Sequence, residues 1–308
     1  MKTLRIGRVL SLVVAFGCSK KETTETQAAP EVQAPQAVAL ALAGIGLATP
    51  ESILYDAQAD QYVVSNVNGS PLAVDDNGFL SRIAPDGNVI APKWVDGASA
   101  AVTLNAPKGM TLVGDTLYVA DISAVRLFDR QSGAPKGSID IAGATFLNDV
   151  ASAPDGTVYV SDTGMKAGPQ GFVPAENDAI YQIRADGSYE AIAQGEALGH
   201  PNGLAWRGDG LVVVTFGTGE VYTLTGGVRA ALAKPQSGSL DGVVALANGR
   251  LLVSSWEGKC VYVLDAAGQY TRVVADVTSP ADIGYDTLRK ALLIPVFSED
   301  AMRVVPLP

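Results

Sequence analysis

Six repeats of short apolar segments, separated by glycine-rich turns, predict an all-β fold, specifically a six-bladed β-propeller. The 308 residues include 33 glycines and 17 prolines, which fall at short intervals between the apolar runs. Long amphipathic helical patterns are missing, and one order of segments recurs from Pro50 to the last residue. Short strands joined by tight turns are typical of β-sandwiches, barrels and propellers, and the repeat favours the propeller.

Each repeat begins with an opening tripeptide, the three residues that lead into an apolar strand. The tripeptides are Pro50–Ser52, Pro107–Gly109, Asn148–Val150, Pro201–Gly203, Leu240–Gly242 and Pro280–Asp282. A second strand rich in Val, Leu and Tyr follows each one, at 62–66, 117–121, 158–162, 211–215, 251–255 and 292–296. Third strands such as 179–183 follow, and turns such as Asp186-Gly187 lead into a fourth. Four strands per repeat is the pattern of a propeller blade.

The sixth repeat ends one strand short, after a third strand at 302–305. The apolar run 38–43 precedes the first tripeptide and can supply the missing strand. We expect this pairing to close the ring, because closure removes the exposed sheet edges of an open array.

The first residues predict export and a lipid anchor. An apolar stretch, 9–17, follows Lys2, Arg5 and Arg8, the layout of a signal peptide over residues 1–17. The segment 15–18 resembles a bacterial lipobox, which predicts lipidation of Cys18; an ordinary signal peptide with a chance cysteine is the alternative. Ser19 at the next position resembles the pattern of lipoproteins sorted to the outer membrane, facing the periplasm. Residues 18–37 predict a disordered linker, and 38–308 the propeller.

Charge narrows the range of partners. The formal net charge is −10, and such an acidic surface repels phosphate backbones and anionic lipid headgroups. We therefore expect no nucleic-acid partner, membrane contact only through the anchor at Cys18, and a monomer. The second cysteine, Cys260, is expected to be a small residue within a strand.

The opening tripeptides carry most of the candidate chemistry. In a propeller they converge on one mouth of the central channel. The loops between second and third strands form the rim of that mouth, and two of them, 67–79 and 163–178, are long. That mouth would gather carboxylate and amide oxygens with one cation: Glu51, Asn148, Asp149, Asn202, Asp241 and Lys108. Such oxygens are hard ligands suited to Ca²⁺, Mg²⁺ or Mn²⁺, and crowded carboxylates repel unless a proton or a cation binds them. Residues that simply form turns are the alternative, although turns do not need Glu51.

At these residues the sequence resembles the senescence marker protein/gluconolactonase family and, more distantly, the paraoxonases. The resemblance spans Pro50 to Pro308 and rests on Pro50-Glu51, Asn148-Asp149, Pro201-Asn202-Gly203 and Asp241-Gly242. It implies a six-bladed propeller whose metal is held by Glu51, Asn148, Asn202 and Asp241. Ca²⁺ is the first expectation for this divalent cation, with Mg²⁺, Mn²⁺ or Zn²⁺ as alternatives.

The sequence departs from this pattern in two respects. It has a single histidine, His200, which excludes the histidine dyad of the paraoxonases. His200 is expected to shape its turn or to line the substrate pocket. Lys108 is also unusual, because a cation in the ligand ring would bind a substrate carboxylate or phosphate, or would partly replace the metal by neutralising Glu51 or Asp149.

Two functions remain open. The first is a divalent-cation-dependent hydrolase of a lactone or related ester, in which Asp241 or Asp149 takes a proton from water. Lys108 and Asn202 would orient the small-molecule substrate, and Trp256 would form an apolar pocket wall with Phe297. The second is a non-catalytic binding or scaffold propeller of the bacterial cell envelope, since a fold does not fix a function.

Overall fold

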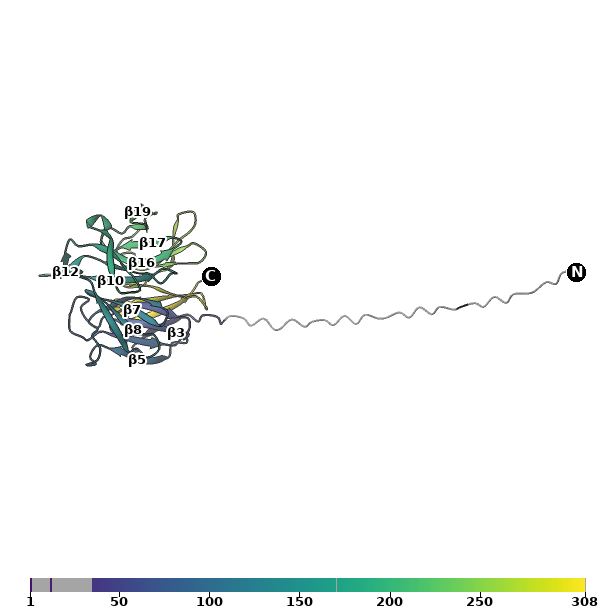
Figure 1. Ribbon diagram of the computed structural model, residues 1–308, viewed down its shortest axis with the longest axis horizontal. Helices are drawn as coiled ribbons and strands as arrows, with labels where there is room; N and C mark the ends of the chain where they lie inside the picture. The colour runs from purple at the N-terminus through teal and green to yellow at the C-terminus, as the bar shows by residue number, and fades with distance from the viewer. Residues whose placement is uncertain (2–11, 13–34, 170, 308) are drawn as a thin grey trace. The chain divides into compact units, whose positions relative to one another are not determined.

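The computed structural model describes Met1, Leu12 and residues 35–169 and 171–307 (Figure 1). Over these residues the chain forms six four-stranded antiparallel sheets, which confirms the predicted six-bladed propeller. The predicted signal peptide apart from Met1 and Leu12, the predicted lipidation site at Cys18 and most of the predicted linker lie outside the described residues. In the described part, no helix is long and apolar enough to cross a membrane. The two helices found there are single 3₁₀ turns, η1 (Glu196–Leu198) and η2 (Phe297–Glu299).

Blades 1 to 3 take their four strands in chain order from the inside of the propeller outwards. Blade 1 consists of β2 (Pro50–Asp56), β3 (Gln61–Asn66), β4 (Phe79–Ile83) and β5 (Val89–Asp96). Blade 2 consists of β6 (Pro107–Val113), β7 (Thr116–Asp121), β8 (Ala124–Asp129) and β9 (Pro135–Asp140). Blade 3 consists of β10 (Leu147–Ser152), β11 (Val158–Asp162), β14 (Ala179–Ile183) and β15 (Tyr189–Gln194). A separate two-stranded hairpin, β12 (Met165–Gly168) with β13 (Gly171–Pro174), lies between β11 and β14 in sequence.

Blades 4 and 5 repeat this arrangement, and blade 6 combines the two ends of the propeller. Blade 4 consists of β16 (Pro201–Arg207), β17 (Gly210–Thr215), β18 (Val221–Thr225) and β19 (Val228–Ala231). Blade 5 consists of β20 (Leu240–Ala245), β21 (Leu251–Ser255), β22 (Cys260–Leu264) and β23 (Tyr270–Val274). Blade 6 consists of β24 (Gly284–Asp286), β25 (Ala291–Val296), β26 (Ala301–Pro306) and β1 (Leu40–Ala43).

The ring closes as the sequence predicted. Strand β1 pairs antiparallel with β26, with Leu40 opposite Val304 and Ala43 opposite Ala301. Along the channel each inner strand contacts the inner strand of the next blade, and β24 of blade 6 returns to β2 of blade 1. Blade 6 therefore takes its outermost strand from the first part of the propeller and its other three strands from the last part, so β1 covers the outer edge of β26 and closes the ring.

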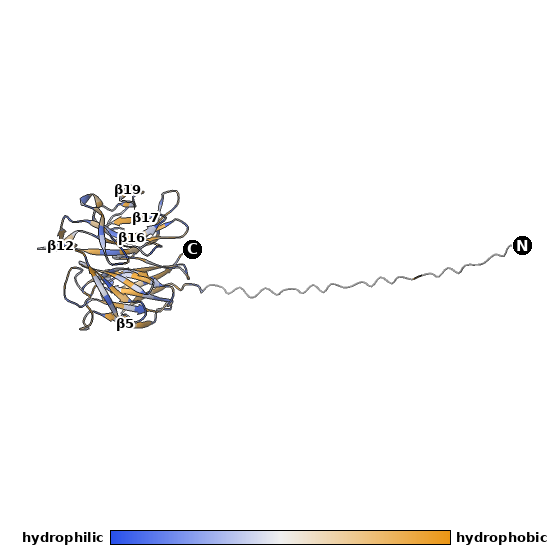
Figure 2. Ribbon diagram, viewed as in Figure 1, coloured by the Kyte–Doolittle hydropathy of each residue, from blue (hydrophilic) through white to orange (hydrophobic). Residues whose placement is uncertain are grey.

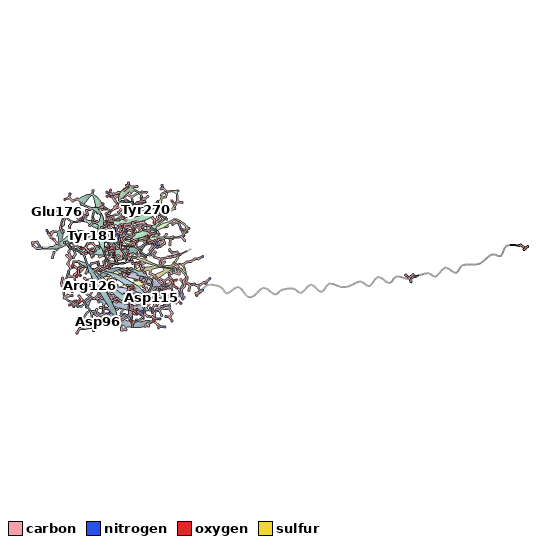
Figure 3. All side chains as sticks on the ribbon, in the orientation of Figure 1. Asp96, Asp115, Arg126, Glu176, Tyr181 and Tyr270 are labelled. Atoms are coloured by element: carbon pink, nitrogen blue, oxygen red, sulfur yellow. The ribbon has the colours of Figure 1, made fainter. Side chains whose placement is uncertain are left out.

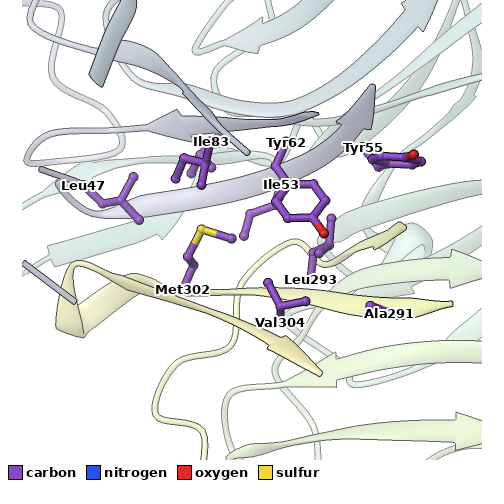
Figure 4. Close-up of a cluster of buried hydrophobic side chains, with 10 residues drawn as sticks. Leu47, Ile53, Tyr55, Tyr62, Ile83, Ala291, Leu293, Met302 and Val304 are labelled. Carbon is purple, nitrogen blue, oxygen red and sulfur yellow. The ribbon is translucent and has the colours of Figure 1, made fainter. Parts of the chain in front are cut away.

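The core lies between the blades. Each neighbouring pair of blades encloses one cluster of buried apolar side chains, which gives six clusters around the ring. Figure 4 shows the cluster at the closure, where Ile53 and Tyr62 of blade 1 meet Leu293, Met302 and Val304 of blade 6. Apolar residues concentrate on the strands, as Figure 2 shows. Because alternate strand residues face opposite neighbours, each blade contributes to two clusters, and burial of both faces fixes the strand register.

Candidate functional site

One extra residue lies near the start of the inner strand in blades 1 to 5. In blade 1, Pro50 pairs with Asn66 and Ile53 pairs with Val64, so three steps along β2 match two along β3. The same shift of register occurs in β6, β10, β16 and β20. Such a bulge leaves residues of one strand without a cross-strand partner and redirects their side chains. The bulges therefore free two residues from the sheet in each of these five blades, and in blades 2, 4 and 5 the second of them is a glycine.

In blades 1 and 3 the two freed residues line two different cavities. The first residues form a set that we call the upper ring: Glu51, Lys108, Asn148, Asn202 and Asp241. They line a cavity of about 250 Å³, the site cavity. The next residues along two of these strands, Ser52 and Asp149, line a second cavity of about 340 Å³ together with Asp282, which precedes β24 of blade 6; we call these three residues the lower ring. The structure thus brings all four predicted metal ligands and Lys108 together.

Glycines make room for this close approach of the inner strands. A Cβ atom on Gly203 would lie 2.3 Å from the carbonyl oxygen of Asp241, and one on Gly242 would lie 2.4 Å from the backbone nitrogen of Ile283. On Gly109 it would lie 2.1 Å from Oδ1 of Asp149. These distances exclude any side chain, so the tripeptide glycines are needed where one inner strand touches the next.

The upper ring presents four buried oxygens that have no hydrogen-bond partner: Oε2 of Glu51, Oδ1 of Asn148, Oδ1 of Asn202 and Oδ1 of Asp241. In the described part of the chain, no other buried carboxylate or amide oxygen lacks a partner. A buried acceptor left unpaired costs about 1 to 3 kcal/mol, so four of them in one ring suit a shared ligand that accepts their lone pairs. Two carboxylates and two amides fit a hard divalent cation. Within the described residues, no three Asp, Glu, His or Cys side chains lie close enough together to hold a metal ion. A cation in the upper ring would therefore need the two amide oxygens as well as the two carboxylates.

Burial and mutual repulsion disfavour the charged form of the ring's carboxylates. The pKa of Asp241 is raised to about 8, first by burial and then by the charge of Asp149, while the nearby Trp256 and Asn202 side chains oppose part of the rise. Burial followed by the charges of Asp241 and Asp282 also raises the pKa of Glu51 well above its usual value. A divalent cation among these oxygens would reverse this effect, because an opposite charge favours the carboxylate.

Lys108 is the only cation among the side chains that line the site cavity. Its Nζ donates a 2.9 Å hydrogen bond to the carbonyl of Ala106 and lies 4.8 Å from the ring centre of Phe146. It forms no ion pair with Glu51 or Asp149, although its charge opposes part of the rise in the pKa of Glu51. Burial lowers the pKa of Lys108 to about 8, although Asp121, Glu51 and Asp162 act in the opposite direction. Its remaining N–H groups are therefore free to bind a ligand.

Asp149 lies away from the predicted site. It follows Asn148 directly, so its side chain turns to the second cavity rather than to the site cavity. Both of its carboxylate oxygens accept 2.6 Å hydrogen bonds from backbone N–H groups, one from Val150 and the other from Leu204. This arrangement ties blade 3 to blade 4 and makes Asp149 unsuited to the role of a catalytic base in the site cavity.

His200 also lies outside the lining of the site cavity. Its Nδ1 is 2.9 Å from the carbonyl of Thr163 and 3.0 Å from Oδ1 of Asp178, and its backbone N–H donates to Oδ2 of the same carboxylate at 2.7 Å. Its backbone is left-handed, with φ of 60°. Of the two roles expected for His200, the structure shows the one in shaping the turn before β16.

The remaining wall of the site cavity is apolar. Trp256 and Phe297 line it, as predicted, with ring centres 5.4 Å apart, and Phe216 packs against Trp256 at 5.7 Å. The full apolar lining is Pro71, Phe146, Met165, Phe172, Phe216, Trp256 and Phe297. Five of these were not predicted from the sequence: Pro71, Met165, Phe172 and Phe216 come from three rim loops and Phe146 from the connection before β10, and alignment of the opening tripeptides compares none of these segments. The buried indole N–H of Trp256 has no hydrogen-bond partner.

Polar residues at the ends of second strands hold the opening tripeptides in place. Asp121 accepts hydrogen bonds from the backbone N–H of Asn105, at 3.1 Å, and of Ala106, at 2.8 Å, and pairs with Arg126, labelled in Figure 3. Asp162 of blade 3 does the same for Phe146, at 2.9 Å. These carboxylates satisfy backbone donors next to the upper ring, which positions the ring without touching its cavity.

Comparisons with known proteins agree with this architecture. The family model "SMP-30/Gluconolactonase/LRE-like region" matches residues 85–283. The fold is similar to that of a gluconolactonase from Xanthomonas campestris, with a TM-score of 0.66 and 23% identity over 89% of this chain and 92% of that one. It is also similar to a putative gluconolactonase (TM-score 0.65, 19% identity, 87% and 92% covered) and a luciferin-regenerating enzyme (0.64, 13%, 88% and 96%). No curated protein matches the sequence. Since the family model covers more than half of its length, this chain belongs to the SMP-30/gluconolactonase/LRE-like family.

Proposed function

We propose that this chain is a divalent-cation-dependent hydrolase that opens a lactone or related ester in the site cavity. The observation that carries the proposal is the set of four buried, unpartnered oxygens at the base of that cavity. Membership of a family named for a gluconolactonase, and structural similarity to proteins described as gluconolactonases, support the choice of reaction.

Glu51, Asn148, Asn202 and Asp241 would hold the cation, with Ca²⁺ as the first candidate. A bound divalent cation polarises a carbonyl group and lowers the pKa of bound water. The side chains of the upper ring come from blades 1, 3, 4 and 5, and each starts from a bulge fixed on both sides by sheet pairing. Their positions therefore depend on the propeller and not on a single flexible loop.

The chain's own residues would bind the substrate and move the proton. Asp241 lines the cavity, and its two carboxylate oxygens would have separate roles: Oδ1, which has no partner, would hold the cation, and we assign the proton of the attacking water to the other oxygen. Asp149 is not assigned this role, because backbone N–H groups hold both of its oxygens. Lys108 would donate a hydrogen bond to the substrate's carbonyl or leaving oxygen, and the unpartnered indole N–H of Trp256 offers a second donor.

A hydrolysis assay tests this proposal. Purified protein loaded with Ca²⁺ should open members of a panel of lactones and aryl esters, and chelation should abolish the activity until Ca²⁺ is restored. Asp241→Asn should lower kcat/KM by about a thousandfold or more, since it removes the proton acceptor and replaces a charged ligand of the cation with an amide. Asp155→Asn, in an exposed turn, serves as the control. Folded, Ca²⁺-loaded protein that is inactive on the whole panel would contradict the proposal.

We further propose that the propeller is anchored by a lipid at Cys18 in a bacterial cell envelope, at the outer membrane and facing the periplasm. The basis is the sequence of the first 19 residues, with its basic start, apolar stretch, cysteine and serine. An anchor would leave the site cavity open to small molecules of that compartment.

A further inference from the structure

We infer that the substrate carries an apolar body and is an alkyl- or aryl-substituted lactone or ester rather than a polyhydroxylated sugar lactone. This inference rests on the proposed hydrolase function and specifies its substrate class. The site cavity has a polar base, formed by the upper ring, and an aromatic wall formed by Phe146, Phe172, Phe216, Trp256 and Phe297. A ligand that complements both parts has a polar ester group at one end and an apolar group at the other.

The rim exposes aromatic surface that a ligand would cover. Phe172 is 49% exposed and Phe216 is 36% exposed, although both line the cavity. The ring centres of Phe172 and Phe146 are 6.0 Å apart in an edge-on contact, and Phe216 packs on Trp256 in the same way. Exposed aromatic side chains that border a concave site mark a binding surface, because covering them removes apolar area from water.

Phe172 belongs to an addition that the other five blades lack among the described residues. Strands β12 and β13 form their own two-stranded sheet in the rim loop of blade 3, with Ala167 opposite Phe172 and Lys166 opposite Val173. Met165, at the start of β12, also lines the cavity. A hairpin that is not part of a blade contributes little to the propeller core, so its apolar side chains at the cavity indicate a role in binding.

Apart from the indole N–H of Trp256, the wall offers no free polar partner for sugar hydroxyl groups. Apart from the upper ring and Trp256, Thr163 is the one lining residue with a polar side-chain group. Its hydroxyl already accepts a 3.0 Å hydrogen bond from Asn148 and donates a 2.8 Å bond to the carbonyl of Pro201. Hydroxyl groups pressed against the aromatic wall would lose their bonds to water without replacement, which disfavours a sugar ring there.

The size of the cavity limits the ligand. A volume of about 250 Å³ equals the space taken by roughly eight water molecules in the liquid. A six-membered lactone ring with a short alkyl substituent fills such a space, and longer groups would extend over the exposed faces of Phe172 and Phe216.

A series of lactones on one ring tests the inference. The substrates are δ-valerolactone, its 5-alkyl derivatives from methyl to butyl, and glucono-δ-lactone, all with the same six-membered ring. We expect kcat/KM to rise roughly fourfold per added methylene and to be lowest for glucono-δ-lactone. Phe172→Ala combined with Phe216→Ala should lower kcat/KM for the butyl member by about tenfold and leave δ-valerolactone within about twofold. Ile90→Ala, an exposed apolar residue of β5 outside the cavity lining, is the matched control.

Equal rates along the series, faster opening of glucono-δ-lactone, or an unchanged series in the double variant would each overturn the inference. Calorimetry with valerolactams that carry the same alkyl groups on the carbon next to the ring nitrogen measures binding alone, because lactams resist hydrolysis. It separates failure of the inference from failure of the proposed function. Suppose that lactam binding strengthens with alkyl length and is weakened in the double variant, but that no lactone is opened. This result would overturn the hydrolase proposal and would still support binding of a ligand with an apolar body. No lactam binding and no lactone opening would overturn both.

Discussion

Asn148 and Thr163 are joined by a hydrogen bond of 3.0 Å that fixes the direction of the Asn148 amide. The Thr163 hydroxyl donates its hydrogen to the carbonyl of Pro201, so it can only accept from Asn148, and the partner atom must be Nδ2. The amide oxygen of Asn148 is therefore turned into the site cavity. Thr163 is a positioning residue for one of the four candidate ligands.

Thr163→Val keeps the shape of this side chain and removes the hydroxyl. We expect affinity for Ca²⁺, measured by calorimetry, to fall by about tenfold, because the amide of Asn148 is no longer held in one orientation. Thr223→Val removes a hydroxyl from β18, where Oγ1 bonds to the carbonyl of Ala230, and should not change the affinity. Equal affinity for Ca²⁺ in both variants would contradict the positioning role of Thr163.

The contact between Gly203 and Asp241 predicts a steric effect on stability. Gly203→Ala would place a methyl group 2.3 Å from the Asp241 carbonyl oxygen, and the inner strands of blades 4 and 5 would have to separate. We expect a loss of about 1 to 3 kcal/mol in the free energy of unfolding, measured with denaturant. Gly238→Ala would place its methyl group 3.0 Å from the side-chain carboxylate of Glu257 and 3.7 Å, an ordinary contact distance, from Cα of Gly219, and is the control. Unchanged stability of Gly203→Ala would show that the strands are not held in this close contact.

The pair formed by Asp56 and Arg130 links blades 1 and 2 and predicts a pH dependence. Burial raises the pKa of Asp56, but hydrogen bonds from Arg130 and from the backbone N–H of Ala59 and Gln58 outweigh it, and the pKa is lowered from 3.8. Because the folded-state pKa is depressed, this contribution to stability is present above about pH 3.8 and is lost as the pH falls through the folded-state value.

Arg130→Met should therefore lower the free energy of unfolding by about 2 kcal/mol at pH 7, since it leaves a buried carboxylate without its cation. It should also flatten the pH dependence of stability below pH 3.8. Arg184→Met breaks the ion pair between Arg184 and Glu190, whose side chains are 46% and 53% exposed respectively. It should lower the free energy of unfolding by less than about 0.5 kcal/mol. The same loss in both variants would contradict the role given to the Asp56 pair.

The proposed anchor predicts where the protein is found. Cys18→Ala should abolish incorporation of labelled fatty acid and move the protein from the membrane fraction to the soluble fraction. Cys260→Ala, which removes a buried thiol of β22, is the control and should change neither result. Labelling that persists in Cys18→Ala would exclude lipidation at this residue.

The repeats determined how much of the fold could be predicted. Blade number, ring closure by 40–43 and convergence of the opening tripeptides follow from period and chain length, because a sheet pattern repeated six times has few ways to bury its edges. The hairpin β12–β13 was predicted only as a long rim loop, since a short pair of strands outside the blades has no counterpart in the repeat.

The site was predicted in part, for a similar reason. Glu51, Asn148, Asn202 and Asp241 share one position in the repeat and lie together. Asp149 is one residue further on, and strand alternation, which was visible in the sequence, would have separated it from them. His200 and Phe172 depend on contacts between loops distant in sequence, with Asp178 and Phe146, and no spacing indicates these.

The central claim, that one divalent cation is shared by oxygens of the upper ring, is tested most directly by metal analysis of the purified chain after dialysis against Ca²⁺. We predict one ion per chain in the unaltered protein and in Asp282→Asn, whose buried carboxylate lines the second cavity. We predict none in Glu51→Gln combined with Asp241→Asn, with folding confirmed by circular dichroism. Retention of a stoichiometric ion in the folded double variant, or its absence from the unaltered protein, would contradict the claim.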